Sequence, residues 1–290
     1  MTALEGTSLD VRPLTGSFGA DVHGLDLSRP LTQDQVAWVT AALAQYLVVS
    51  FRGQDLDIDQ LEAFAKQLGD FGDSPFITPV DGHPNVLAVV REAEETGPLF
   101  GSGWHSDWSF QPAPPSATIL YAKELPPHGG DTAFTNQQLA YETLSTGMQQ
   151  LLVGLNGVHS ARRSYGPAGS FGRPDPQAAM DIRGDERAVV EQLHPLVRVH
   201  PVNGRRSLFV NDVYTVGLED MTAAESAPLL DFLSAHSKQI NHTCRVRWET
   251  GTVTMWDNRS VQHFAVNDYS GYRREMLRVT LAGEAPIPVT

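Results

Sequence analysis

The sequence predicts a mixed α+β fold in which a β-sandwich or barrel core of short strands carries flanking helices and one long insertion. Apolar segments of strand length, bounded by turn residues, recur along most of the chain. Helical spacing of apolar residues marks several segments between them. Because 290 residues suit one such core with additions, we expect residues 1–290 to form a single domain.

The N-terminal part alternates between the two patterns. Short strands are predicted within residues 9–27 and at 47–51 and 86–91, where apolar residues lie between glycines and other turn formers. Helices are predicted at 32–46 and 57–68, because apolar residues recur there at three- and four-residue intervals. These helices are expected to pack on the sheet that the strands form.

The remaining elements follow from the same patterns. A helical pair is predicted at 137–155, with its break near Gly147, and a single helix at 222–240. Thr222 and Glu225 have the spacing of a capping box at the start of that helix. Further strands are predicted at 116–122, 131–134, 196–200, 207–211, 245–248, 252–256 and 274–281.

Residues 162–185 are rich in Gly, Pro, Arg and Ser and have no apolar periodicity. Loops of this length in a compact domain are usually functional or disordered. We therefore expect a lid-like insertion here.

Composition excludes several functions. A net charge of -13 argues against a nucleic-acid partner, which would need clustered Lys and Arg. Cys244 is the single cysteine, so neither an intrachain disulfide nor a cysteine metal cluster is expected. The chain has no signal-like start and no long apolar run, so we expect no membrane partner and a cytoplasmic location. A symmetric homo-oligomer is expected as the usual state of soluble enzymes.

Trp104-His105-Ser106-Asp107 and the later His263 offer two imidazoles and one carboxylate, the ligand set of non-haem iron(II) oxygenases. In an extended strand, residues two apart point to the same side, so His105 and Asp107 can reach one metal ion. Turn formers at 257–258 would place His263 at the start of the next element. Three ligands on one face would leave the opposite face of the metal open.

A His-X-Asp triplet also occurs by chance, and a lone histidine is more often a structural residue than a ligand. The other histidines lack a carboxylate two residues away in a plausible strand, and most are expected on the surface or in packing positions. His159 and His200 are kept as alternative ligands.

Several passages, in order along the chain, make it similar to the taurine dioxygenase family of iron(II) and 2-oxoglutarate dependent oxygenases. They are residues 49–54, 104–107, 124–126, 129–132, 208–211 and 256–269, together with Arg274 and Arg278. Several anchors with the expected gaps are far more specific than one triplet. The resemblance implies a double-stranded β-helix, or jelly-roll, in which His105, Asp107 and His263 hold Fe(II).

The resemblance also implies that Arg274 pairs with the distal carboxylate of 2-oxoglutarate while Thr132 hydrogen-bonds to it, with O2 as the other co-substrate. A guanidinium can form a bidentate, charge-assisted pair with a carboxylate. Residue chemistry alone also allows a surface salt bridge for Arg274. Arg273 is expected to face the other way, because alternate strand residues point to opposite faces.

Arg278 lies four residues beyond Arg274, a spacing that puts both on one strand face. The family resemblance implies that this position binds an anionic group of the primary substrate, although a partly buried structural role is the alternative. Where relatives acting on taurine have a histidine, this chain has Thr78, which argues against taurine itself. A pocket for a larger apolar body is expected from four aromatic residues, each also a candidate core residue: Trp108, Phe76, Tyr214 and Phe171.

The function expected from these residues is a dioxygenase that couples oxidative decarboxylation of 2-oxoglutarate to hydroxylation of a small organic acid. The acid would carry a carboxylate, sulfonate or sulfate ester on an apolar or aromatic body. Hydroxylation beside a heteroatom would lead to cleavage of the ether, ester or sulfonate. Two alternatives stay open: hydroxylation or desaturation of a natural-product intermediate, and a non-catalytic jelly-roll that binds an anion, with zinc in its site. Halogenation is disfavoured because relatives that halogenate lack the carboxylate ligand, and Asp107 is present.

Overall fold

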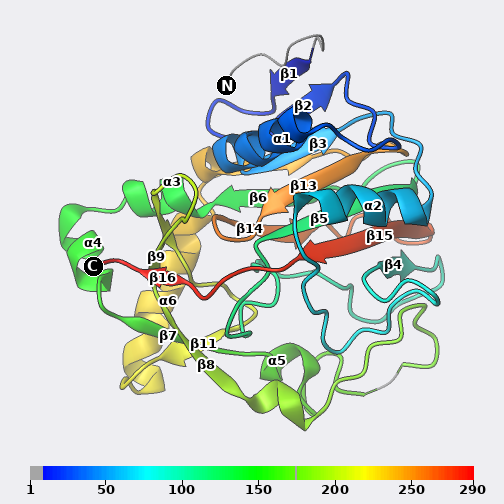
Figure 1. Ribbon diagram of the computed structural model, residues 1–290. Coiled ribbons are helices and arrows are strands. Elements are labelled where there is room, and N and C mark those ends of the chain that lie inside the picture. Colours follow the sequence, from blue (N-terminus) through cyan, green and yellow to red (C-terminus); the bar gives the residue numbers. More distant parts are fainter. Residues whose placement is uncertain (1–8, 174) are drawn as a thin grey trace.

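A seven-stranded sheet forms the centre of the molecule (Figure 1), in the order β1-β2-β3-β13-β5-β15-β4. The computed structural model describes residues 9–173 and 175–290. Neighbouring strands of this sheet are antiparallel except β2 and β3. The strands are β1 Asp10–Pro13, β2 Ala20–His23, β3 Val48–Phe51, β4 Leu87–Arg91, β5 Ala117–Glu124, β13 Val253–Asp257 and β15 Arg274–Leu281.

Two amphipathic helices, α1 (Gln33–Tyr46) and α2 (Ile58–Leu68), cover one face of this sheet. Each helix begins with a capping box, in which the side chains of the N-cap residue and of a glutamine three residues later satisfy free backbone N–H groups. Leu47 ends α1 with a φ of 63°, so the chain turns directly into β3. Their apolar stripes and the sheet enclose the largest apolar core.

A three-stranded sheet in the order β12-β6-β14 packs against the opposite face of the large sheet. Its strands are β6 Thr132–Asn136, β12 Thr243–Val246 and β14 Val261–Ala265. Phe134 and Val261 from this sheet meet Trp256 and Met276 from the large sheet in a second core. The two sheets therefore form a sandwich, and β14 places His263 along one edge of it.

Two further three-stranded sheets lie beside the sandwich, in the orders β11-β7-β8 and β10-β9-β16. Their strands are β7 Asn156–Ser160, β8 Glu191–Pro195, β9 Val197–Val199, β10 Arg206–Leu208, β11 Thr215–Leu218 and β16 Ile287–Pro288. The remaining helices are α3 Gln137–Glu142, α4 Thr146–Leu152, α5 Arg162–Tyr165 and α6 Ala223–Ser237, with 3-10 helices η1 Glu186–Val189 and η2 Ile240–His242.

The predicted mixed α+β class is confirmed, as are both N-terminal helices, the broken pair α3 and α4, and α6 with its Thr222 cap. The insertion at 162–185 is not wholly irregular, because it opens with the short helix α5. Strands β7, β8, β11 and β16 were not predicted, and β14 was expected only as an element of unstated type beginning at His263. Among the described residues, no helix combines the length and apolar character that crossing a membrane would need.

Candidate metal centre and its surroundings

His105 and His263 are joined through their backbones. The N–H of His105 donates to the carbonyl of His263 at 3.1 Å, and the N–H of His263 donates back at 2.8 Å. The predicted strand through residues 104–107 is wrong, because this is an isolated bridge and a turn begins at Asp107. Trp108 has a φ of 45°, which bends the chain at once after the carboxylate. The bridge, rather than a regular strand, brings the three side chains together.

The donor atoms of His105, Asp107 and His263 all lie within 4.8 Å of one another, and the three residues are buried. Oδ1 of Asp107 is 3.5 Å from Nε2 of His105 and 3.8 Å from Nε2 of His263. Nδ1 of His105 lies 2.7 Å from the carbonyl oxygen of Gly103 and donates to it, so Nε2 is the ring nitrogen that faces Asp107 and His263. Two imidazole nitrogens and one carboxylate oxygen thus converge as a metal-binding group should.

Charge within the cluster also suits a cation. Burial opposes ionisation of Asp107, but Arg278, His263 and His105 outweigh it and hold the pKa of Asp107 well below its usual range. Burial, followed by the neighbouring His105, lowers the pKa of His263 to about 3. At neutral pH the carboxylate is therefore charged and His263 is neutral, which are the protonation states that bind metals.

Arg278 on β15 reaches Asp107, one of the three clustered residues. Its Nη2 is 2.8 Å from Oδ1 of Asp107, and its guanidinium lies 5.2 Å from the ring centre of Trp108 and 5.8 Å from that of Phe100. The side chain is buried, yet neither Nε nor Nη2 has an aligned hydrogen bond within the described ranges. Arg278 thus meets Asp107 through charge and still has unused donors.

Arg274 lies on the same side of β15 and is also buried. Over the described part of the chain it has no carboxylate within 4 Å, and its Nε has no hydrogen-bond partner. Burial lowers its pKa, with only partial relief from Tyr269 and Asp131. Gly130 fits closely beside it, because a Cβ there would come within 3.2 Å of Nε. A buried guanidinium without a counter-charge fits an anionic ligand.

Thr132 and Arg274 approach the same tryptophan. Nε1 of Trp248 donates to the Thr132 hydroxyl at 3.0 Å, and the Arg274 guanidinium lies 6.0 Å from the centre of the Trp248 ring. Arg273, by contrast, is partly exposed and pairs with Glu92, Glu124 and Glu275, so it faces away from Arg274 as expected.

Two neighbouring cavities lie beside Arg274 and His105. One cavity, of about 260 Å³, is lined by Arg274 and Tyr269. The insertion at 162–185 contributes Phe171, Met180 and Ile182 to its lining. The other, of about 200 Å³, is lined by residues that include His105, Tyr165, Tyr214 and again Phe171. Both cavities are lined by residues 98–100 and 170–171, so the insertion forms part of a wall that the two cavities share.

Most of the aromatic residues expected at the substrate pocket lie together. The Tyr165 ring stacks on Phe76 at 4.9 Å and lies 5.8 Å from both Trp108 and Phe171. The Tyr214 ring is 5.9 Å from that of His105. Tyr165 was not predicted as a member of this aromatic cluster. Its position near the start of the insertion at 162–185 was the only sequence signal that could have indicated it.

Thr78 lies apart from these aromatic rings. It is exposed, its hydroxyl donates to Asp181 at 2.6 Å, and it lines neither cavity.

The two alternative histidine ligands are elsewhere. His159 is buried against Ser109, with Nδ1 3.0 Å from the serine hydroxyl, and His200 is buried against Asp257 at 2.9 Å. Their prediction as alternative ligands is therefore wrong: neither belongs to the His105, Asp107 and His263 cluster.

Comparisons with known proteins show the family of this chain. Residues 10–280 match the taurine catabolism dioxygenase family named TauD, TfdA. A sulfate ester dioxygenase of Pseudomonas putida, dependent on alpha-ketoglutarate (2-oxoglutarate), is 37% identical over 99% of this chain and 94% of its own. An alkylsulfatase of Acinetobacter baylyi is 34% identical over 95% of this chain and 86% of its own.

A 2,4-dichlorophenoxyacetate dioxygenase of Cupriavidus pinatubonensis, also dependent on alpha-ketoglutarate, is 32% identical over 97% of this chain and 100% of its own. Among solved structures, a taurine dioxygenase from Burkholderia xenovorans superposes with a TM-score of 0.81 at 36% identity, covering 97% of this chain and 93% of that one. This chain therefore belongs to the TauD, TfdA family and is a 2-oxoglutarate dependent dioxygenase.

Proposed function

We propose that His105, Asp107 and His263 hold Fe(II), and that Arg274 and Thr132 bind the distal carboxylate of 2-oxoglutarate. The observation that carries this proposal is the buried Arg274 guanidinium. It has no carboxylate partner within residues 9–173 and 175–290, and it lies on the same strand as Arg278, which contacts Asp107. When bound, the metal supplies the oxidising chemistry with O2 and the co-substrate. The chain's own residues orient both small molecules and exclude water.

The primary substrate is a small organic acid whose anionic group binds Arg278. The unused donors on the Arg278 guanidinium support this role, since a sulfate, sulfonate or carboxylate oxygen would satisfy them. Tyr214, Phe171 and Tyr165 enclose its apolar body from the cavity beside His105, and Trp108 and Phe76 pack against Tyr165. The relatives named for sulfate esters, alkyl sulfates and an aryloxy acid support the same class.

Cleavage follows from where the hydroxyl is added. Hydroxylation of the carbon that bears the ester or ether oxygen gives a hemiacetal-type product, which collapses to a carbonyl compound and releases sulfate or an alcohol. Of the possible substrates we favour an alkyl sulfate ester, because the relative with 37% identity is named for sulfate esters. Thr78, exposed and bonded to Asp181, offers no imidazole for taurine.

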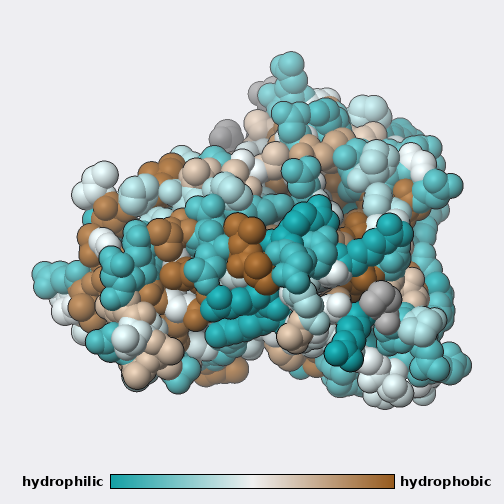
Figure 2. All heavy atoms as spheres, turned by 90° about the horizontal axis from the view of Figure 1, so that it is seen from below, coloured by the Kyte–Doolittle hydropathy of each residue, from teal (hydrophilic) through white to brown (hydrophobic). Residues whose placement is uncertain are grey.

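The same reasoning extends to the fold and the assembly. We infer that the two packed sheets form a jelly-roll, that residues 1–290 are a single domain, and that 162–185 closes over the substrate as a lid. The shared cavity wall at 170–171 supports the lid. A homo-oligomer is supported by exposed apolar side chains such as Val190 next to η1 and Leu193 on β8; Figure 2 shows hydrophobic patches among hydrophilic ones on the face seen from below. Light scattering on a sizing column tests it.

The enzymatic test is substrate-dependent formation of succinate, with the aldehyde and sulfate products counted in parallel. Medium-chain alkyl sulfates are expected to give all three products in equal amounts, aryloxyalkanoates less, and taurine the least. Succinate without any cleavage product would favour hydroxylation or desaturation of another molecule. No succinate across the acid panel, despite bound metal, would contradict the proposed class of substrate.

A further inference from the structure

The Asp107 carboxylate has two oxygens with different surroundings. Oδ1 faces the two imidazole Nε2 atoms and Arg278. Oδ2 points the other way and accepts a hydrogen bond of 2.6 Å from the hydroxyl of Thr118 on β5. Thr118 is fully buried and lines neither of the two cavities. Its hydrogen bond decides which oxygen is free for a metal.

Thr118 is in turn fixed by Asn258, which lies in the turn between β13 and β14. Nδ2 of Asn258 donates to the Thr118 hydroxyl at 2.9 Å. Oδ1 of Asn258 accepts from Nε1 of Trp256 at 3.0 Å and from the N–H of Asp107 at 3.3 Å. Because the threonine accepts from the amide, its single proton is directed at Asp107. The hydrogen bonds therefore run in one direction, from Asn258 through Thr118 to Oδ2 of Asp107.

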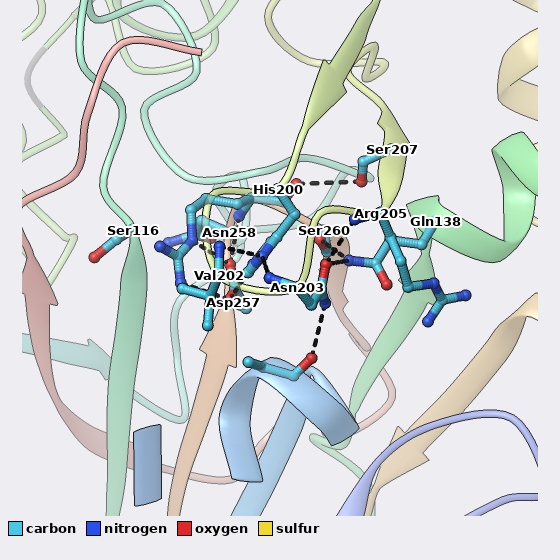
Figure 3. Close-up of polar contacts among 12 residues, drawn as sticks. Ser116, Gln138, His200, Val202, Asn203, Arg205, Ser207, Asp257, Asn258 and Ser260 are labelled. Carbon is cyan, nitrogen blue, oxygen red and sulfur yellow. Dashed lines mark hydrogen bonds and ion pairs between the residues drawn. The ribbon is translucent and has the colours of Figure 1, made fainter. Parts of the chain in front are cut away.

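The turn that carries Asn258 is itself anchored on several sides (Figure 3). Next to it, Asp257 accepts from Nε2 of buried His200 at 2.9 Å. Nδ1 of His200 accepts from the N–H groups of Val202 and Asn203, so Nε2 is the ring nitrogen that donates to Asp257.

Further contacts hold the turn on its other sides. The N–H of Asn258 donates to the carbonyl of Ser116 at 3.0 Å, and Nε2 of Gln138 donates to the hydroxyl of Ser260 at 2.7 Å. The guanidinium of buried Arg198 donates to the carbonyl of Asn258 at 2.5 Å. Rotation of the Asn258 amide or movement of its backbone would break several of these bonds at once.

We propose that Thr118 and Asn258 are positioning residues that aim Oδ1 of Asp107 at the metal. This inference rests on the proposed metal site. Without the Thr118 hydroxyl, Oδ2 would lose its only hydrogen bond in the described part of the chain, and the carboxylate could rotate toward Arg278, which lies 2.8 Å from Oδ1. Residues that orient a metal ligand typically change metal affinity by about 10- to 100-fold when they are replaced.

The test measures Mn(II) binding to the metal-free protein by titration calorimetry, without substrate or co-substrate. Thr118→Val keeps the shape of the side chain and removes the hydroxyl, so we expect the Kd for Mn(II) to rise about 10- to 100-fold. Thr118→Ser restores the hydroxyl and should stay within about threefold of the unchanged protein. Asn258→Ser removes the donor to Thr118 but keeps a turn-forming residue, and it should weaken binding in the same direction.

Thr254→Val is the matched control. Thr254 is also fully buried in the large sheet, and its hydroxyl bonds to Ser50 at 2.9 Å without touching the site. It should lose a similar amount of thermal stability and keep its affinity for Mn(II). If Thr118→Val and Asn258→Ser bind Mn(II) as well as Thr254→Val does, the positioning role is overturned while the metal site stands. If the unchanged protein binds no Mn(II), both the metal site and this inference fail.

Discussion

Arg274 and Arg278 lie four residues apart on one strand, on the same face and almost equally buried, but they have opposite electrostatic surroundings. Arg278 has the carboxylate of Asp107 at 2.8 Å. Arg274 has aromatic rings and a glycine around it, and no carboxylate within 4 Å among the residues described. An uncompensated buried charge is costly, so such a site is built for a ligand that brings the opposite charge.

The different surroundings of Arg274 and Arg278 indicate two different roles, which the residue type alone could not distinguish. Among the described residues no carboxylate pairs with Arg274, so its charge is available to an anionic ligand. Arg278 already shares its charge with Asp107 and, under the proposed function, would also bind the anionic group of the substrate. We therefore expect changes at Arg274 to act on 2-oxoglutarate alone, whereas changes at Arg278 act on the substrate and on Asp107.

The largest expected effect is at Arg274. Arg274→Gln removes the charge that would pair with the distal carboxylate, so we expect the Mn(II)-loaded protein to bind 2-oxoglutarate at least about 100-fold more weakly in an equilibrium titration. Arg274→Lys should recover part of the affinity, because it keeps the charge without the bidentate fork. Arg273→Gln is the matched control, since its side chain pairs with surface glutamates. Equal losses at positions 273 and 274 would contradict the dedicated role.

A smaller and differently distributed effect is expected at Arg278. Arg278→Gln should raise the KM for an alkyl sulfate at least about tenfold, because the anion loses its charged partner. The KM for the co-substrate should change less than about threefold. Steady-state kinetics with each compound varied in turn gives both numbers. A parallel rise in the two KM values would erase the distinction between the two arginines.

The parts that the sequence could predict are those that depend on local chemistry. Capping residues, helical spacing and the turn formers before His263 marked α1, α2, α6 and β14 correctly or nearly so. The His-X-Asp pair was recognised although its strand was not real, because a backbone bridge to His263 replaces the strand.

The parts that it could not predict depend on contacts between distant segments. Thr118 and Asn258 are 140 residues apart and become neighbours only because β13 pairs with β5. Tyr165 joins the aromatic cluster only because the insertion at 162–185 begins next to Trp108 in the folded chain. The opposite surroundings of the two arginines likewise depend on side chains from other elements.

A substitution at Trp108 tests whether the aromatic ring next to Arg278 contributes to substrate binding. Its Nε1 is buried and has no hydrogen-bond partner among the described residues, and its ring lies over Arg278. Trp108→Phe keeps an aromatic ring and removes the N–H, so we expect a rise of about threefold in the substrate KM with little change in the co-substrate KM. An unchanged substrate KM would make Trp108 a packing residue. Phe264→Leu, on β14 against Trp104, serves as an aromatic control.

The smallest expected effect concerns pH and the metal-free protein. Since the pKa of Asp107 is held below its usual range in the folded state, the stability that Asp107 and Arg278 contribute is present above about pH 4 and is lost as the pH falls below that. The difference in unfolding free energy between the unchanged protein and Arg278→Gln should therefore be constant above about pH 5 and shrink as the pH falls below about 4. The corresponding difference for Arg274→Gln should stay constant. Denaturant unfolding with a chelator present measures both differences in unfolding free energy. Equal pH dependence for the two variants would contradict the different surroundings of Arg274 and Arg278.

The most direct test is an anaerobic titration in which 2-oxoglutarate is added to the protein loaded with Fe(II), followed by visible charge-transfer absorption. We predict a band that saturates at one 2-oxoglutarate per chain, disappears in Asp107→Ala, and requires far higher concentrations in Arg274→Gln. Absence of the band in the unchanged protein, or an undiminished band in Asp107→Ala, would contradict a joint site built from the His105, Asp107 and His263 cluster and Arg274.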